Sequence, residues 1–423
     1  MNQNQGLDAT DMRLSNNNLV LQLLWQHQTI SRADLARLTG MSRPSISDIV
    51  AEHIELGLVS EVGHGTSNGG RRPVMLRFED EAHLLAGLDI GATHVSLMLT
   101  NLRGQEVSWS ARAVATRDEP DLAIEAAQEL LSEGLACARR QKRKLIGLGV
   151  GISSPAYRQS AACALSVHPA IHPRWAGYQL GKILAQQVAV PIFIENDANL
   201  GALAEYWWTT QRNRRHLLYL KVASGVGAGV IIDGKIFSGA HGIAGELGHT
   251  FIAERQQGPE LEPTAENLNR RIGAQHLLEK FKGKGQALGV QVGDRGQVFE
   301  RGKILRRMHE AGEAPAVIDA FIQDLSIAIV NAMVSFDPAI VSLGGIVPDL
   351  GEELFTQLRR RIQSQLVWPE LQMIPIQCSR FGEKQTALGA ATLVLENMLN
   401  NLPLFCEGRD RRERSSIREL SLN

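Results

Sequence analysis

The sequence has little cysteine, no excess of charge of one sign and no long hydrophobic run. Its four cysteines, at positions 137, 163, 378 and 406, are far apart and form no C-x-x-C pair, so neither a disulfide framework nor a cysteine zinc site is expected. The 44 basic and 45 acidic residues give a formal net charge of −1, which argues against a polybasic coat protein but allows a small local DNA-binding surface. No apolar run of about 18 residues and no secretory signal are visible, which predicts a cytoplasmic protein without a membrane partner.

The pattern of apolar and polar residues along the chain predicts a short N-terminal head and a long α/β body. Residues 1–15 are polar and are expected to form a flexible arm, and residues 16–80 have compact helical periodicity. From residue 84 to residue 400, short apolar runs alternate with helical patterns, among them one expected over residues 265–281, which is typical of an α/β fold. Residues 401–423 form a polar C-terminal tail.

The head has the spacing of a winged helix-turn-helix. Ser31 and Ser42 are placed to cap the second and third helices, and Gly40 supplies the turn between them, because a sharp helix reversal favours a residue that tolerates positive φ. Apolar residues at helical spacing are expected to face inward on the three helices; they are Leu19, Leu23, Leu24, Leu35, Leu38, Ile46, Ile49, Val50 and Ile54.

Polar residues at two places in the head predict contact with DNA. Arg43, Ser45 and Ser47 fall on the outer face of the third helix near its start, where short polar side chains suit base edges and phosphates. Arg71 and Arg72 follow a glycine-rich hairpin tip that can enter a minor groove as a wing. Residues 1–78 contain seven arginines and seven acidic residues, so the head has no net charge and a three-helix protein-interaction module is the alternative.

Two glycine hairpins in the body suit the close approach of a phosphate. The first combines Asp89 with Gly91 and Thr93 between two strands, with the carboxylate placed near a metal ion. The second lies within residues 223–229 and includes Ser224, Gly225 and Gly227. Their similarity indicates a duplicated body.

A polar constellation lies after the first hairpin. Asn196 and Asp197 follow a buried strand and start a helix, where ligands usually bind in α/β sheets, although an N-cap role is the alternative. Glu246 and His249 sit three residues apart between glycines. Together these four side chains offer donors and acceptors for a polyhydroxylated ligand.

These motifs, in this order, resemble the ROK family (repressors, open reading frames, kinases). The resemblance covers roughly residues 84–400, and the winged head matches its xylose-repressor-type branch. It implies an actin-like, ribonuclease-H-like two-lobed ATPase fold with a sugar in the cleft. In the kinases the aspartate that matches Asp197 is the general base, Asn196, Glu246 and His249 match sugar contacts, and Glu266 is the expected match for a further glutamate.

The sequence departs from the family pattern in two places. Residues 250–266 contain no cysteine, so the family's zinc loop is absent and no cofactor is expected. Ala223 and Ala92 stand where kinases commonly have glycine, so the hairpins are expected to be remnants of a nucleotide site.

The sequence therefore predicts a sugar-responsive repressor of carbohydrate-utilisation genes. Its expected partners are double-stranded operator DNA, a monosaccharide or sugar-phosphate effector, and a second copy of the chain in a homodimer or a dimer of dimers. The alternatives are an active ATP-dependent sugar kinase with a regulatory head, and a regulator whose signal is a partner protein docked on the body.

Overall fold

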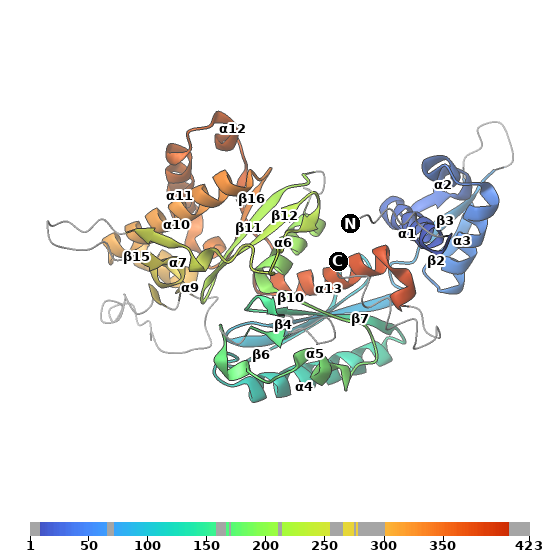
Figure 1. Ribbon diagram of the computed structural model, residues 1–423, viewed down its shortest axis with the longest axis horizontal. Coiled ribbons are helices and arrows are strands. Elements are labelled where there is room, and N and C mark those ends of the chain that lie inside the picture. The colour runs from blue at the N-terminus through green and yellow to red at the C-terminus, as the bar shows by residue number, and fades with distance from the viewer. Residues whose placement is uncertain are drawn as a thin grey trace, which may run out of the picture.

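The computed structural model describes residues 9–65, 72–157, 166–168, 171–209, 214–253, 265–274, 276–277 and 301–405. A small head lies beside a body of two lobes (Figure 1). The head contains α1 (Ala9–His27), β1 (Thr29–Ser31), α2 (Arg32–Thr39), α3 (Arg43–Glu55), β2 (Val59–His64) and β3 (Val74–Phe78). Its strands form an antiparallel sheet in the order β1-β3-β2, which completes a winged helix-turn-helix.

The caps predicted for the head are confirmed. Ser31 Oγ accepts a hydrogen bond from the Asp34 amide at 3.1 Å, and Ser42 Oγ accepts one from the Ser45 amide at 3.3 Å. Gly40 ends α2 with φ of 72°, in the left-handed region that favours glycine.

Part of the predicted head is wrong. Residues 9–15 belong to α1 rather than to a flexible arm. Leu19, Leu38 and Ile54 are exposed by 40%, 53% and 36%, because other residues supply the apolar contacts at these places. On α1 the buried residues are Val20, Leu21, Leu24 and Trp25.

The first lobe is built on one five-stranded sheet. Its strands are β4 (His83–Ile90), β5 (His94–Thr100), β6 (Glu106–Ala113), β7 (Lys144–Ile152) and β10 (Ile192–Asn196), in the order β10-β7-β4-β5-β6. The helices α4 (Pro120–Arg140) and α5 (Leu180–Ala185) cover one face (Figure 1). Strand β6 lies at the edge of the sheet, and its residues are only partly buried. It therefore lacks the apolar run that marks the other strands in the sequence.

The second lobe repeats this topology. Its strands are β11 (Leu217–Val222), β12 (Val226–Ile232), β13 (Lys235–Ile236), β16 (Val341–Gly345) and β17 (Ile376–Cys378), in the order β17-β16-β11-β12-β13. In both lobes the first strand pairs antiparallel with its hairpin partner and parallel with its other neighbour. The duplication indicated by the glycine hairpins is therefore present in the sheets.

Helices cover the outer face of the second sheet. They include α10 (Pro315–Phe336) and α11 (Gly351–Gln365), with α9 (Arg301–Glu310) and the short α12 (Pro369–Gln372) nearby. Helix α10 is long and apolar enough to cross a membrane by length and composition, but it is a core helix packed on α11 and on α7 (Leu268–Ile272).

Two helices occupy the space between the lobes. Helix α13 (Gln385–Asn400) lies on the first sheet, α6 (Asp197–Trp208) lies on the second, and the two pack on each other. The packing is close because glycines stand at the contacts: a Cβ on Gly149 would lie 1.9 Å from the Ala390 carbonyl oxygen, and one on Gly389 would lie 1.9 Å from that of Leu200.

A short connector joins head and body. Only residues 79–82 separate β3 from β4. The Asp80 carboxylate accepts a hydrogen bond from Arg103 Nε at 2.6 Å, and the Glu81 carboxylate pairs with Arg143 at 2.7 Å. The Glu79 amide donates to the Leu58 carbonyl at 2.8 Å, so the connector is bonded to both parts.

The prediction of a helix over residues 265–281 is wrong for its first residues. Residues 265–267 form β15 (Ala265–Asn267), which pairs with β14 (Phe251–Ala253), and only then does α7 begin. Residues 278–281 lie outside the described residues, as does the C-terminal tail after residue 405.

Candidate functional site

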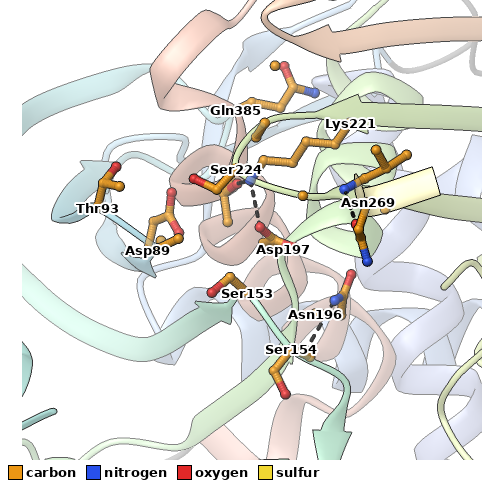
Figure 2. Close-up of a pocket in the computed structure, with 18 of the residues that line it drawn as sticks. Asp89, Thr93, Ser153, Ser154, Asn196, Asp197, Lys221, Ser224, Asn269 and Gln385 are labelled. Atoms are coloured by element: carbon orange, nitrogen blue, oxygen red, sulfur yellow. Dashed lines mark hydrogen bonds and ion pairs between the residues drawn. The ribbon is translucent and has the colours of Figure 1, made fainter. Parts of the chain in front are cut away.

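A cleft with a cavity volume of about 270 Å³ opens between the lobes. It brings together ten of the residues singled out in the body, namely Asp89, Gly91, Thr93, Asn196, Asp197, Ser224, Gly225, Gly227, Glu246 and His249. Figure 2 shows Asp89 and Thr93 of the first hairpin, Ser224 of the second hairpin and Asp197 at the start of α6 around the same space. Glu246 and His249 come from the segment between β13 and β14. The carboxyl ends of β4, β10 and β11 thus meet at one place, as expected for ligand sites of α/β sheets.

Asn196 and Asp197 lie at the junction of β10 and α6. Asn196 is the N-cap of α6: its Oδ1 accepts hydrogen bonds from the Ala198 and Asn199 amides, and its Nδ2 donates to the Ser154 carbonyl at 3.2 Å. These bonds fix the end of the helix and leave the next residue, Asp197, to present its carboxylate to the cleft (Figure 2). The N-cap alternative for Asn196 is therefore correct, although the residue also lines the cleft.

Asp197 is held by a lysine that no sequence motif indicated. Lys221 Nζ on β11 lies 2.7 Å from Asp197 Oδ2 and 3.2 Å from Thr386 Oγ1, which belongs to α13. Burial alone would lower the pKa of Lys221, but the carboxylates of Asp197 and Asp89 together raise it above its ordinary value. The lysine is therefore charged and joins three elements of the cleft.

Asp89 is the next-to-last residue of β4, just before the first glycine hairpin. Its Oδ2 lies 3.1 Å from His94 Nε2, and its Oδ1 is buried without a hydrogen-bond partner among the described residues. A Cβ on Gly91 would lie 2.5 Å from the His94 ring, so a larger residue there would have to displace the ring from Asp89.

The second hairpin is occupied by an asparagine that the sequence did not indicate. Asn269 Oδ1, from α7, accepts a hydrogen bond from the Val226 amide at 2.8 Å. The Ala223 amide donates to the Gly225 carbonyl at 2.8 Å. Two of the backbone donors that a phosphate needs are thus already used inside the hairpin.

Glu246 and His249 form the wall of the second lobe. Gly245 precedes them with φ of 88°, and a Cβ there would lie 2.0 Å from the Ala228 carbonyl oxygen, which holds this segment tightly on β12. His249 Nε2 lies 3.9 Å from Glu246 Oε2, and the histidine side chain is about half exposed. Burial, and to a lesser extent the charge of Asp197, raises the pKa of Glu246 from 4.5 to about 7.

The raised pKa of Glu246 predicts a pH-dependent loss of stability. The folded protein holds this proton more tightly than the unfolded chain does, so stability falls as the pH rises from 4.5 to about 7. Relative to Glu246→Gln, the free energy of unfolding of the natural protein should fall by about 3 kcal/mol across this window. Urea unfolding of both proteins at several pH values measures this difference. A difference independent of pH would contradict the prediction.

One predicted sugar-binding residue is not among those that line the cleft, and one predicted DNA-binding residue lies outside the described residues. Glu266 lies on β15, its backbone pairs with Ile252 of β14, and it is not among the described residues that line the cleft. Its predicted sugar contact is therefore not supported by its position. Arg71 lies outside the described residues.

The candidate DNA-binding residues lie on the head as the sequence predicted. Arg43, Ser45 and Ser47 are exposed in the first turns of α3, and Arg72, just before β3, is exposed as well. Ser45 Oγ lies 2.8 Å from Ser42 Oγ, so this hydroxyl is shared with the helix cap. The start of α3 thus presents the Arg43 guanidinium to the solvent.

Within the described ranges, no group of three or more His, Cys, Asp or Glu side chains is placed to hold a metal ion. The described cysteines, Cys137 and Cys378, are free thiols.

The geometry defines a class of protein: a two-lobed, actin-like ATPase fold that carries a winged DNA-binding head. The same arrangement is found in a solved structure of a ROK family transcriptional regulator described as a homologue of the Escherichia coli MLC protein, with a TM-score of 0.73, 20% identity, and coverage of 94% of this chain and 100% of that chain. The body alone is similar to a ROK family glucokinase from Streptomyces griseus in complex with glucose and AMPPNP, with a TM-score of 0.56, 21% identity, and coverage of 73% and 98%.

The chain belongs to the ROK family, which its sequence matches over residues 85–397. It is 26% identical over 395 residues to the xylose repressor of Caldicellulosiruptor bescii. The aligned region covers 92% of this chain and 98% of that protein. It is 25% identical over 401 residues to the xylose repressor of Bacillus subtilis, covering 94% and 99%.

Proposed function

We propose that this protein is a transcriptional repressor whose affinity for operator DNA changes when a monosaccharide binds in the interlobe cleft. The observation that carries the proposal is that two helices, α6 and α13, begin at the cleft and end at the DNA-binding head. The names of the full-length relatives, which are xylose repressors, agree with it.

Helix α6 makes the first connection. It begins at Asp197 in the cleft and ends, roughly 18 Å away, at Trp207 and Trp208. Trp25 of α1 in the head packs on both of them, with ring centroids 5.3 Å and 6.4 Å apart. A ligand that moves the start of α6 therefore acts on an aromatic contact with the head.

Helix α13 makes the second connection. Its first turn carries Thr386, which contacts Lys221 in the cleft. Its last turn meets α1, where Gln22 Nε2 donates to Asn400 Oδ1 at 2.9 Å and Asn18 donates to the Asn400 carbonyl. Figure 1 shows α13 reaching from between the lobes to the side of the head.

The head is expected to bind the major groove with α3 and a minor groove or phosphates with the wing. One head without net charge binds weakly, so we propose a dimer that presents two heads to a two-fold operator. The sugar must bind one arrangement of heads more tightly than the other to change operator affinity. We propose that the protein acts in the cytoplasm without a metal ion or nucleotide cofactor.

An active sugar kinase with a regulatory head is the second candidate, because Asp197 occupies the position of a general base. The Lys221 ion pair and the internally bonded second hairpin argue against it. A coupled ATP-consumption assay with glucose, N-acetylmannosamine, fructose and xylose decides between the two. Turnover that is abolished by Asp197→Asn would establish the kinase.

The proposed function predicts that a monosaccharide shifts operator affinity at least tenfold. Fluorescence anisotropy of a labelled fragment of the promoter upstream of the protein's own operon measures this shift while a panel of monosaccharides is titrated. The expected reason is that ligand binding biases the two helices that reach the head. If no sugar changes the anisotropy and calorimetry detects no sugar binding, the proposal fails. If a sugar binds but the operator affinity is constant, the coupling through α6 and α13 is wrong.

A further inference from the structure

Lys221 is a buried cation in the floor of the cleft. Its side chain is 17% exposed and that of Asp197 is 15% exposed, so the ion pair between them is largely shielded from water. Figure 2 shows the lysine extended from β11 toward Asp197, with Ser224 and Gln385 around it. An ion pair at this depth interacts strongly with any further charge that enters the cleft.

Two buried carboxylates, those of Asp197 and Asp89, lie in the same part of the cleft as the ammonium group of Lys221. Asp197 contacts the ammonium group directly, and Asp89, whose side chain is 2% exposed, contributes a second carboxylate to the same floor. Arg117 also lines the cleft, but it is exposed. The floor therefore holds the Lys221 ammonium group in direct contact with Asp197, and beside it the Asp89 carboxylate, whose Oδ2 lies 3.1 Å from His94 Nε2. The charge of Lys221 is thus already matched by the Asp197 carboxylate before an anion enters.

A neutral ligand and an anionic ligand interact differently with Lys221 and Asp197. A sugar hydroxyl can accept a hydrogen bond from Lys221 Nζ and donate one to Asp197, so it joins the pair without adding charge. A phosphate monoester brings between one and two negative charges beside both carboxylates. The second hairpin cannot compensate fully, because Asn269 and Gly225 already occupy the Val226 and Ala223 amides.

We propose that Lys221 is a specificity-determining residue: paired with Asp197 and Thr386, it admits a neutral sugar hydroxyl to the floor of the cleft and excludes the corresponding sugar phosphate. This inference rests on the proposed sugar-binding function and names the chemical class of its effector. The same pair keeps the Asp197 carboxylate in contact with the Lys221 ammonium group.

The test compares neutral sugars with their phosphates on the full-length protein. Isothermal titration calorimetry is run with the pairs glucose and glucose 6-phosphate, mannose and mannose 6-phosphate, and N-acetylglucosamine and its 6-phosphate. For every pair that binds, the neutral sugar is expected to bind at least tenfold more tightly. A phosphate that binds as tightly as its parent sugar overturns the proposal.

A charge cycle tests whether Lys221 is responsible. Asp197→Asn leaves Lys221 with one fewer counter-charge, so it should bind the sugar phosphate at least tenfold more tightly than the natural protein does. Adding Lys221→Met to that variant should abolish the gain. Lys235→Met is the control, because this exposed lysine lies on β13 of the same sheet and outside the cleft. Thermal unfolding establishes that each variant is folded before its affinity is compared.

The outcomes separate this inference from the function on which it rests. If sugar phosphates bind tightly and also shift operator affinity, the repressor function stands and the role of Lys221 is wrong. An Asp197→Asn variant that is folded but gains no phosphate affinity likewise overturns it. If no sugar or sugar phosphate of the three pairs binds, and no sugar of the monosaccharide panel binds, the proposed sugar-responsive function fails. The inference about Lys221 then fails with it.

Discussion

Replacement of Trp25 by alanine is expected to remove the response to sugar and to destabilise the head by about 3–5 kcal/mol. Trp25 is 5% exposed, packs on Trp207 and Trp208, and lies beneath Arg103 at 4.6 Å. Its Nε1 also donates to the Leu102 carbonyl at 2.9 Å. The variant should bind sugar in the cleft normally, because no atom of this cluster lines it, while sugar no longer changes operator affinity.

The measurement combines calorimetry of sugar binding, thermal unfolding and operator anisotropy. Trp25→Phe should retain part of the response, since it keeps an aromatic ring but not the hydrogen bond to Leu102. Trp368→Ala is the matched control, because that tryptophan is 52% exposed beside α12, in the second lobe. A Trp25→Ala protein that still responds fully to sugar would show that the aromatic contact does not transmit the signal.

Replacement of Arg43 by alanine is expected to weaken operator binding by about 10- to 100-fold. Arg43 is the first residue of α3, directly after the Ser42 cap, and is exposed at the end of the helix that a winged head inserts into the major groove. If the guanidinium reads a guanine, the loss should be largest for the natural operator; if it contacts phosphate, the loss should be similar for all sequences and the salt dependence should flatten.

The controls for this prediction come from the body and the wing. Arg112→Ala removes an exposed arginine that pairs with Glu133 on the first lobe, and it should leave operator affinity unchanged. Arg72→Ala should weaken binding less than Arg43→Ala and lower the salt dependence, as expected for a contact to the backbone or the minor groove. Operator affinity that is the same in Arg43→Ala and in the natural protein would contradict the assignment of α3 as the recognition helix.

The sequence was sufficient for most of the architecture because the strands and helices are strongly patterned. The hairpin residues around Gly91 and Gly227 marked where strands reverse, in β4-β5 and β11-β12. The caps Ser31 and Ser42 fixed where the head helices begin. These signals are local, and local signals can be read without knowledge of the fold.

The remaining features depend on contacts between distant segments. Lys221 lies inside an apolar strand, and nothing near it in the chain indicates that Asp197 and Thr386 face it. Asn269 reaches the hairpin at Val226 from 43 residues away. The errors in the head also depend on tertiary packing: Leu38 has helical spacing with Leu35, but Leu35 is buried in the folded head whereas Leu38 is 53% exposed.

The connector of residues 79–82 determines how strictly the proposed dimer depends on the spacing between two operator half-sites. Because these few residues are bonded to Leu58 on one side and to Arg103 and Arg143 on the other, the head cannot swing independently of the first lobe. Inserting one base pair between two half-sites shifts the far one by roughly 3.4 Å and rotates it by roughly 35° about the duplex axis. A rigidly mounted pair of heads cannot follow that rotation, so the protein should demand a single half-site spacing, set by the body's dimer contact.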